Sequence, residues 1–206
     1  KSKYTLGKGV SIGAPKKMKK IFKKNFKVSK KPKIMFVSTN LYSGYMGNYG
    51  NIQSDFKRYK IEKEIIDKFL SKINMEVIFK TYPEFNFRFV DENPIIKHLE
   101  KYPKIEIFNE KIDLRYIFNK ADIFITSRIT STFGWVAITN RPTIFINYKN
   151  IDPIHPDIYQ QFDDSFFIFN FEDEKFYNKL NDLLSMTTKD IYKLWQSKHS
   201  SRQAFI

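Results

Sequence analysis

A short segment near the middle of the chain combines hydroxyl side chains with one cation. Every residue from Thr126 to Thr132 except Arg128 and Ile129 carries a hydroxyl. A helix is predicted to begin within this segment, and the free N–H groups and dipole of a helix amino end favour an anion. Serine and threonine add compact hydrogen-bond donors, and an arginine can hold a phosphate through two parallel hydrogen bonds. The segment therefore predicts a phosphate-binding loop that contains Ser127, Arg128, Thr130, Ser131 and Thr132.

Helix capping is the simpler role for these hydroxyls. Thr130 or Ser131 could serve as the N-cap of the helix, which serine and threonine do routinely. One cap accounts for one hydroxyl and not for a whole loop of them, so we favour a ligand. Gly134 lies within the same helix, where glycine costs up to about 1 kcal/mol relative to alanine. It either allows close approach of a ligand or is incidental to packing.

Two further loops carry candidate residues. Ser38 and Thr39 follow the apolar run Ile34–Val37 and begin a long loop rich in hydroxyl, amide and glycine residues. This loop lacks the dinucleotide pattern G-x-G-x-x-G and a P-loop lysine, and it is either a segment that closes over a ligand or a plain surface loop. Lys80 ends the next apolar run, where it could neutralise a diphosphate or belong to a charged surface turn.

The sequence gives little support for a disulfide, a metal site or a catalytic histidine. The chain has no cysteine, which excludes disulfides and thiolate metal sites and fits a cytoplasmic protein. Of three histidines, His155 alone follows a predicted strand, and a proline-flanked surface loop explains it better than catalysis. No residues have the spacing of a zinc or calcium site. We therefore expect no metal and no obligatory cofactor.

Apolar runs and helical periodicity alternate along the chain. Strands are predicted at Ile34–Val37, Glu76–Thr81, Lys104–Phe108, Ala121–Thr126, Thr143–Asn147 and Ser165–Asn170, and helices at Asp55–Ile73, Ile95–Lys101, Leu114–Lys120, Thr130–Asn140, Glu172–Leu184 and Lys189–Lys198. This alternation indicates right-handed crossovers and a Rossmann-like α/β fold, a doubly wound parallel sheet with helices on both faces. Ligands of such sheets bind beyond the carboxyl ends of the strands, where the candidate loops would lie.

Charge is concentrated at the start of the chain. Thirteen lysines precede the first acidic residue, Asp55, so that only +1 of the net charge of +14 belongs to residues 55–206. We predict a lysine-rich extension or linker at residues 1–32 and one globular domain at residues 33–206. The extension could also bind an anionic membrane surface, whereas nucleic acid is disfavoured because the extension has no arginine and the domain is nearly neutral. No apolar run approaches the roughly 20 residues that span a bilayer.

The run ADIFITSRITSTFGWVAITNRPTIFIN, from Ala121 to Asn147, resembles the C-terminal, donor-binding half of GT-B-type glycosyltransferases of bacterial surface polysaccharides. In those families a strand ending in D-x-hydrophobic-x-S/T leads into a small hydroxylated loop, a helix, and then x-x-P-hydrophobic. The segments KIMFVSTNL and EVIFKTYPE fall where such domains place their first strands. The best comparison is the surface-carbohydrate transferase family related to capsule and teichoic-acid transferases, and the similarity covers roughly Lys33 to Leu184.

The resemblance implies a nucleotide-activated sugar or polyol-phosphate donor and a polysaccharide or lipid-linked acceptor. It implies that Thr130, Ser131 and Thr132 bind the donor phosphates, with Lys80 near the same diphosphate. Two departures matter. Tyr82-Pro83 stands where many relatives have His-Pro, and the glutamate that contacts the ribose in many relatives has no equivalent, which leaves the nucleotide open.

In GT-B enzymes the catalytic base usually belongs to an N-terminal acceptor domain, so we assign no catalytic residue here and expect the donor half of a transferase. Such a protein would work in the bacterial cytoplasm, either free or attached to the inner face of the cell membrane. The alternative is a non-catalytic module that docks a polysaccharide-assembly complex to lipid through residues 1–32.

Overall fold

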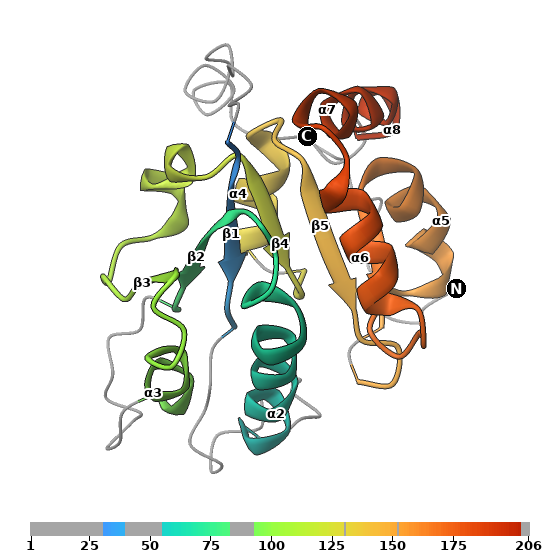
Figure 1. Cartoon of the computed structure of the whole chain (residues 1–206). Helices are drawn as coiled ribbons and strands as arrows, with labels where there is room; N and C mark the ends of the chain where they lie inside the picture. The colour runs from blue at the N-terminus through green and yellow to red at the C-terminus, as the bar shows by residue number, and fades with distance from the viewer. Residues whose placement is uncertain (1–30, 40–54, 83–92, 130, 152, 203–206) are drawn as a thin grey trace.

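The computed structural model describes residues 31–39, 55–82, 93–129, 131–151 and 153–202 (Figure 1). These residues form one six-stranded sheet in the order β3-β2-β1-β4-β5-β6, and every strand pair is parallel. The strands are β1 (Lys33–Val37), β2 (Glu76–Lys80), β3 (Ile105–Phe108), β4 (Ile123–Thr126), β5 (Thr143–Asn147) and β6 (Phe167–Asn170). The predicted doubly wound, Rossmann-like parallel sheet is confirmed.

Helices or 3₁₀ turns connect successive strands, and three further helices of the described chain follow the last strand. They are α2 (Asp55–Ile65), α3 (Pro94–Leu99), α4 (Ser131–Ile138), α5 (Pro156–Ser165), α6 (Phe176–Ser185), α7 (Thr188–Ser197) and α8 (His199–Arg202), with a π-helical turn η1 (Ile66–Leu70) and two 3₁₀ turns, η2 (Leu114–Tyr116) and η3 (Phe118–Lys120). In Figure 1, α6 lies in front of the sheet and α4 behind it. None of the described helices is long and apolar enough to cross a membrane.

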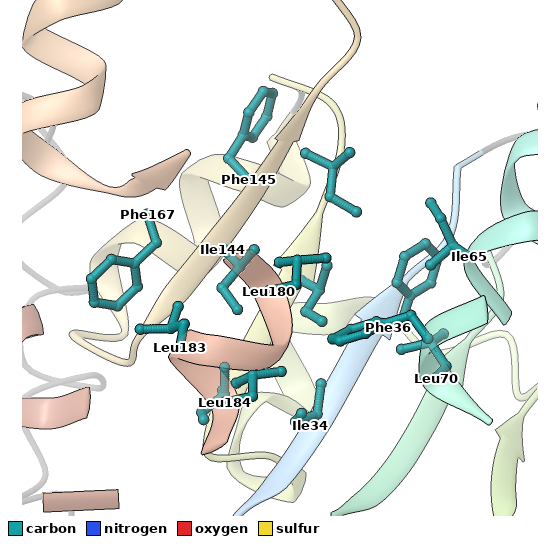
Figure 2. Close-up of a cluster of buried hydrophobic side chains, with 14 of the residues drawn as sticks. Ile34, Phe36, Ile65, Leu70, Ile144, Phe145, Phe167, Leu180, Leu183 and Leu184 are labelled. Atoms are coloured by element: carbon teal, nitrogen blue, oxygen red, sulfur yellow. The ribbon is translucent and has the colours of Figure 1, made fainter. Parts of the chain in front are cut away.

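The sheet is buried on both faces, as its continuous apolar runs predict. Side chains alternate between faces along β1: Ile34 and Phe36 belong to one core cluster, and Met35 and Val37 belong to a second. Figure 2 shows Phe36 beside Ile65 and Leu70 of the segment formed by α2 and η1. The two faces of β1 therefore fix which helices can cover the middle of the sheet.

Asp67 joins the α2–η1 segment to α3. Its carboxylate accepts hydrogen bonds from the Tyr102 hydroxyl at 2.7 Å and from Lys63, and it lies 2.6 Å from Nε2 of the buried His98. Burial opposes ionisation of Asp67, but these hydrogen bonds prevail and lower its pKa below the ordinary range. The ionised carboxylate thus ties α3 and the residues after it to the α2–η1 segment.

The structure differs from the predicted elements in two places. The predicted helix Leu114–Lys120 is instead two 3₁₀ turns separated by Ile117, whose backbone at φ −124° and ψ 7° is not helical. No helix is predicted between the fifth and sixth strands, where His155 is expected in a proline-flanked loop, but Pro156–Ser165 forms α5, with Pro156 at its first position, where a proline is well tolerated. The side chain of His155 caps α5 by accepting from Asp157 N. The predicted sixth strand therefore begins at Phe167 rather than at Ser165, which ends α5.

The lysine-rich extension predicted at residues 1–32 lies outside the described residues except for its last two positions. The division into an extension and a domain from residue 33 stays a prediction. The long loop predicted after Thr39 likewise lies mostly outside the described part of the chain.

We expect Asp67→Asn to lower the free energy of unfolding at neutral pH by about 1–3 kcal/mol, because charge-assisted hydrogen bonds are lost. The folded pKa of Asp67 lies below its unfolded value of about 3.9, so this stabilisation is complete at neutral pH, begins to weaken below about pH 4 and disappears only as pH falls through the lower folded pKa. Urea denaturation at about pH 7 and about pH 2 measures the difference. Asp182→Asn, at an exposed position of α6, is the matched control, and equal stability of both variants at pH 7 would contradict the role of Asp67.

Candidate functional site

The strand order creates a topological switch point at β1. From β1 the chain proceeds to β2 and β3 on one side, and it then returns to place β4 on the other side. The connections that leave β1 and β4 diverge, and doubly wound sheets bind ligands in the crevice outside these strand ends. Ser38 and Thr39 follow β1 here, and Ser127 and Arg128 follow β4. Two of the candidate loops therefore meet at the switch point.

A cleft lies between these loops and α2. Three predicted site residues line it, namely Thr39, Ser127 and Arg128, together with Arg58, Ile61, Glu62, Tyr148 and Ile151. The space open to the centre of a water molecule is about 20 Å³, enough for about one water. A phosphate-sized group would accordingly lie at the mouth of the cleft rather than inside it.

Glu62 is the acidic side chain of this cleft. It is 5% exposed, and its carboxylate accepts from Ser38 Oγ at 2.8 and 2.9 Å and from Thr39 N at 3.3 Å. Burial raises the pKa of Glu62 to about 7, although the bonds from Ser38 and Thr39 and the charge of Arg58 oppose the rise. Glu62 thus holds the end of β1 against α2 and changes its charge near neutral pH.

The opposite wall of the cleft follows β5. The Asn147 side chain accepts from Ile154 N at 3.1 Å and donates to Asn170 Oδ1 at 2.7 Å, which positions the chain that follows the strand. Tyr148 comes next, is 8% exposed and is hydrogen-bonded to Ser127. Burial, followed by the nearby Glu62 carboxylate, raises the pKa of Tyr148 above its ordinary value. The tyrosine therefore stays neutral and supports the loop after β4.

Lys80 does not line the cleft. It pairs in register with Val37, so it shares the sheet face of the second core cluster and not the face that α2 covers. Its ammonium donates to the backbone carbonyls of Thr81 at 2.5 Å and Glu110 at 3.2 Å. Burial lowers the pKa of Lys80 to about 8. A contact between Lys80 and a donor diphosphate stays a prediction, and it would require the ammonium to leave these carbonyls.

The remaining predicted residues begin the helix after β4. Thr130 lies outside the described residues, and Ser131 is the first residue of α4, with Thr132 next; only the backbone of these two is described. The amino end of α4 therefore comes five residues after β4 ends at Thr126, as the anion-site prediction requires. Binding of phosphate by Thr130, Ser131 and Thr132 stays a prediction.

Sequence reasoning missed Glu62 as a site residue. The buried positions of the segment formed by α2 and η1 recur at helical spacing, and Glu62 falls among them: Arg58, Ile61, Glu62, Ile65, Ile66 and Phe69. A carboxylate on the apolar face of a helix can be recognised in the sequence. It indicates a buried acid with specific partners, because an unpartnered charge is rarely buried. Within the described residues, no three histidine, cysteine or acidic side chains are grouped as a metal site needs.

No protein-family model matches the chain, and no curated protein sequence matches it. Among solved structures, MurG of Acinetobacter baumannii is similar to the chain, with a TM-score of 0.49 and 14% sequence identity. The similarity covers 92% of this chain and 52% of that one, so the chain spans about half the length of MurG.

The unfolding free energy should depend on pH through Glu62. Between about pH 4.5 and 7 the folded chain keeps a proton on Glu62 that the unfolded chain releases, so stability falls as pH rises through this window. We expect the wild type to lose about 2–3 kcal/mol between pH 5 and pH 8 relative to Glu62→Gln, measured by urea denaturation. Glu100→Gln, at an exposed position after α3, should keep the wild-type dependence. Parallel pH profiles for the wild type and Glu62→Gln would refute the buried titration.

A substitution at Gly134 can distinguish a glycine that allows close approach of a ligand from a glycine that is incidental to packing. Among the atoms that the structure describes, an added Cβ at this position would meet nothing within 4 Å, and the residue is exposed on α4. Gly134→Ala should therefore stabilise the chain by about 0.5–1 kcal/mol in chemical denaturation. A destabilised variant would show that the glycine is required for packing, whereas a stabilised variant with weaker ligand binding would favour close approach of a ligand.

Proposed function

We propose that this chain is the donor-binding domain of a GT-B-type glycosyltransferase of bacterial surface-polysaccharide biosynthesis. The donor is a nucleotide-activated sugar or polyol phosphate. The observation that carries the proposal is the switch-point cleft, which is lined by Thr39 after β1 and by Ser127 and Arg128 after β4. The amino end of α4 follows directly in the chain, and its N–H groups favour an anion.

In this proposal the site stabilises the departing nucleotide diphosphate. Negative charge grows on that group as the bond to the sugar breaks, and fixed donors aimed at it lower the barrier. Arg128 and the amino end of α4 supply charge and hydrogen bonds, with the hydroxyls of Thr130, Ser131 and Thr132 as further donors. This stabilisation needs no metal. The base that activates the acceptor is assigned to a separate acceptor domain, so this domain holds the donor and does not complete the reaction alone.

The acceptor class in this proposal is a polysaccharide or a lipid-linked saccharide at the inner face of the cell membrane. The extension at residues 1–32 supplies the contact with anionic lipid, because its lysines attract acidic headgroups. The nucleotide of the donor is to be identified by experiment.

A panel of UDP-glucose, GDP-mannose, CMP-sialic acid and CDP-glycerol tests donor binding by thermal shift and calorimetry with the full chain. We expect one donor to raise the melting temperature, and Arg128→Ala to weaken its binding by about tenfold or more, as expected when a charged hydrogen bond to phosphate is lost. No response to any of the four donors would sink the proposal.

Lys193→Ala is the matched control, because it removes one exposed positive charge from α7. That helix lies at the amino ends of the strands, where Tyr192 donates to Asp122 O and Trp195 donates to Asn140 O. An equal loss of affinity in Arg128→Ala and Lys193→Ala would mean that net charge, and not the cleft, determines binding.

A further inference from the structure

Glu62 occupies an unusual position for a site that is proposed to bind phosphate. Its carboxylate is nearly completely buried and lines the same small cleft as Arg128. A phosphate at the mouth of this cleft would bring a second negative charge close to the carboxylate. Like charges in a poorly solvated space strongly disfavour each other, and the usual relief is uptake of a proton by the weaker acid.

The groups that face Glu62 come from four segments. Arg58 belongs to the same helix and donates to Thr39 Oγ1 at 3.4 Å, so it is engaged with the end of β1 as well. Ser38 Oγ and Thr39 N donate to the carboxylate from the segment after β1. Ser127 and Arg128 face the cleft from the segment after β4, and Tyr148 faces it from the segment after β5. Among the described cleft residues the two arginines are the cations and Glu62 is the acid.

Protonation of Glu62 would leave its present contacts possible. A carboxylic acid still accepts hydrogen bonds through its remaining lone pairs, so Ser38 and Thr39 can stay in place. It also gains one O–H donor, which a carboxylate lacks and which a phosphate oxygen can accept. The proton comes from solvent and resides on a Glu62 oxygen, and no covalent bond of the ligand changes.

We propose that Glu62 couples the binding of an anionic ligand at the switch-point cleft to the uptake of a proton, so that the cleft binds phosphate more tightly as pH falls below neutrality. The inference rests on the proposed function for the identity of the ligand but not for the coupling itself, because any phosphate-like anion would produce it. Glu62 is thus a positioning residue whose charge sets the anion affinity of the site. The pKa of Glu62 near 7 places the transition within the physiological range.

Calorimetry of the full chain with the donor that binds from the four-member panel tests the coupling. These donors carry no phosphate proton that titrates between pH 6 and 8, so any proton taken up at pH 7 belongs to the protein. Titration in buffers of different ionisation enthalpy counts that proton. If the bound phosphate raises the pKa of Glu62 by about one unit, the affinity falls about fivefold between pH 6 and pH 8.

Glu62→Gln keeps an acceptor for Ser38 and Thr39 but cannot titrate. We expect this variant to take up no proton and to bind with the same affinity at pH 6 and pH 8, and we expect Glu100→Gln to behave as the wild type. Wild-type binding without proton uptake, or an unchanged pH dependence in Glu62→Gln, overturns the coupling.

Sodium sulfate can test the coupling independently of the proposed function, because the sulfate ion is a dianion throughout this pH range. Its stabilisation of the chain relative to sodium chloride should be larger at pH 6 than at pH 8, and Glu62→Gln should abolish the difference. Sulfate coupling without binding of any donor would contradict the proposed function alone. Donor binding without any dependence on Glu62 would contradict the coupling alone. If neither anion binds at the cleft, both proposals fail.

Discussion

The rest of the structure depends on the burial of both faces of β1. Its side chains enter two core clusters in alternation, so the strand can lie only in the interior of the sheet with helices in front and behind. With β2 on one side and β4 on the other, the chain must change direction at β1. The switch point, and with it the divergence of the loops after β1 and β4, is a consequence of packing this strand in the centre.

In the switch-point cleft, hydrogen bonds to Glu62 stabilise the fold, whereas the burial of its charge destabilises it. Ser38 and Thr39 donate to Glu62 and hold the end of β1 against α2. The same burial makes the ionised carboxylate costly, because few other groups compensate for the loss of water. A buried carboxylate that lowers the stability of the fold is often part of a functional site, because groups with perturbed pKa values are common there.

Most of the fold could be predicted because its signals are local. The apolar runs at Ile34–Val37 and Thr143–Asn147 and the helical periodicity after Asp55 each reside in a few neighbouring residues. Where packing overrides a local pattern, prediction fails: Leu114–Lys120 has helical periodicity but folds as two 3₁₀ turns around the buried Ile117. α5 was missed because Pro153 and Pro156, on either side of His155, suggested a loop, although Pro156 begins a helix.

The sequence by itself determined the doubly wound class and the candidate loops, because strand ends and hydroxyl-rich segments are properties of short stretches of chain. Only the tertiary structure decided which residues meet. It brings Ser127 and Arg128 to Thr39, a separation of almost ninety residues bridged by the pairing of β1 with β4, and it adds Glu62 and Tyr148. It also places Lys80 on the other face of the sheet, because its register with Val37 fixes the direction of its side chain.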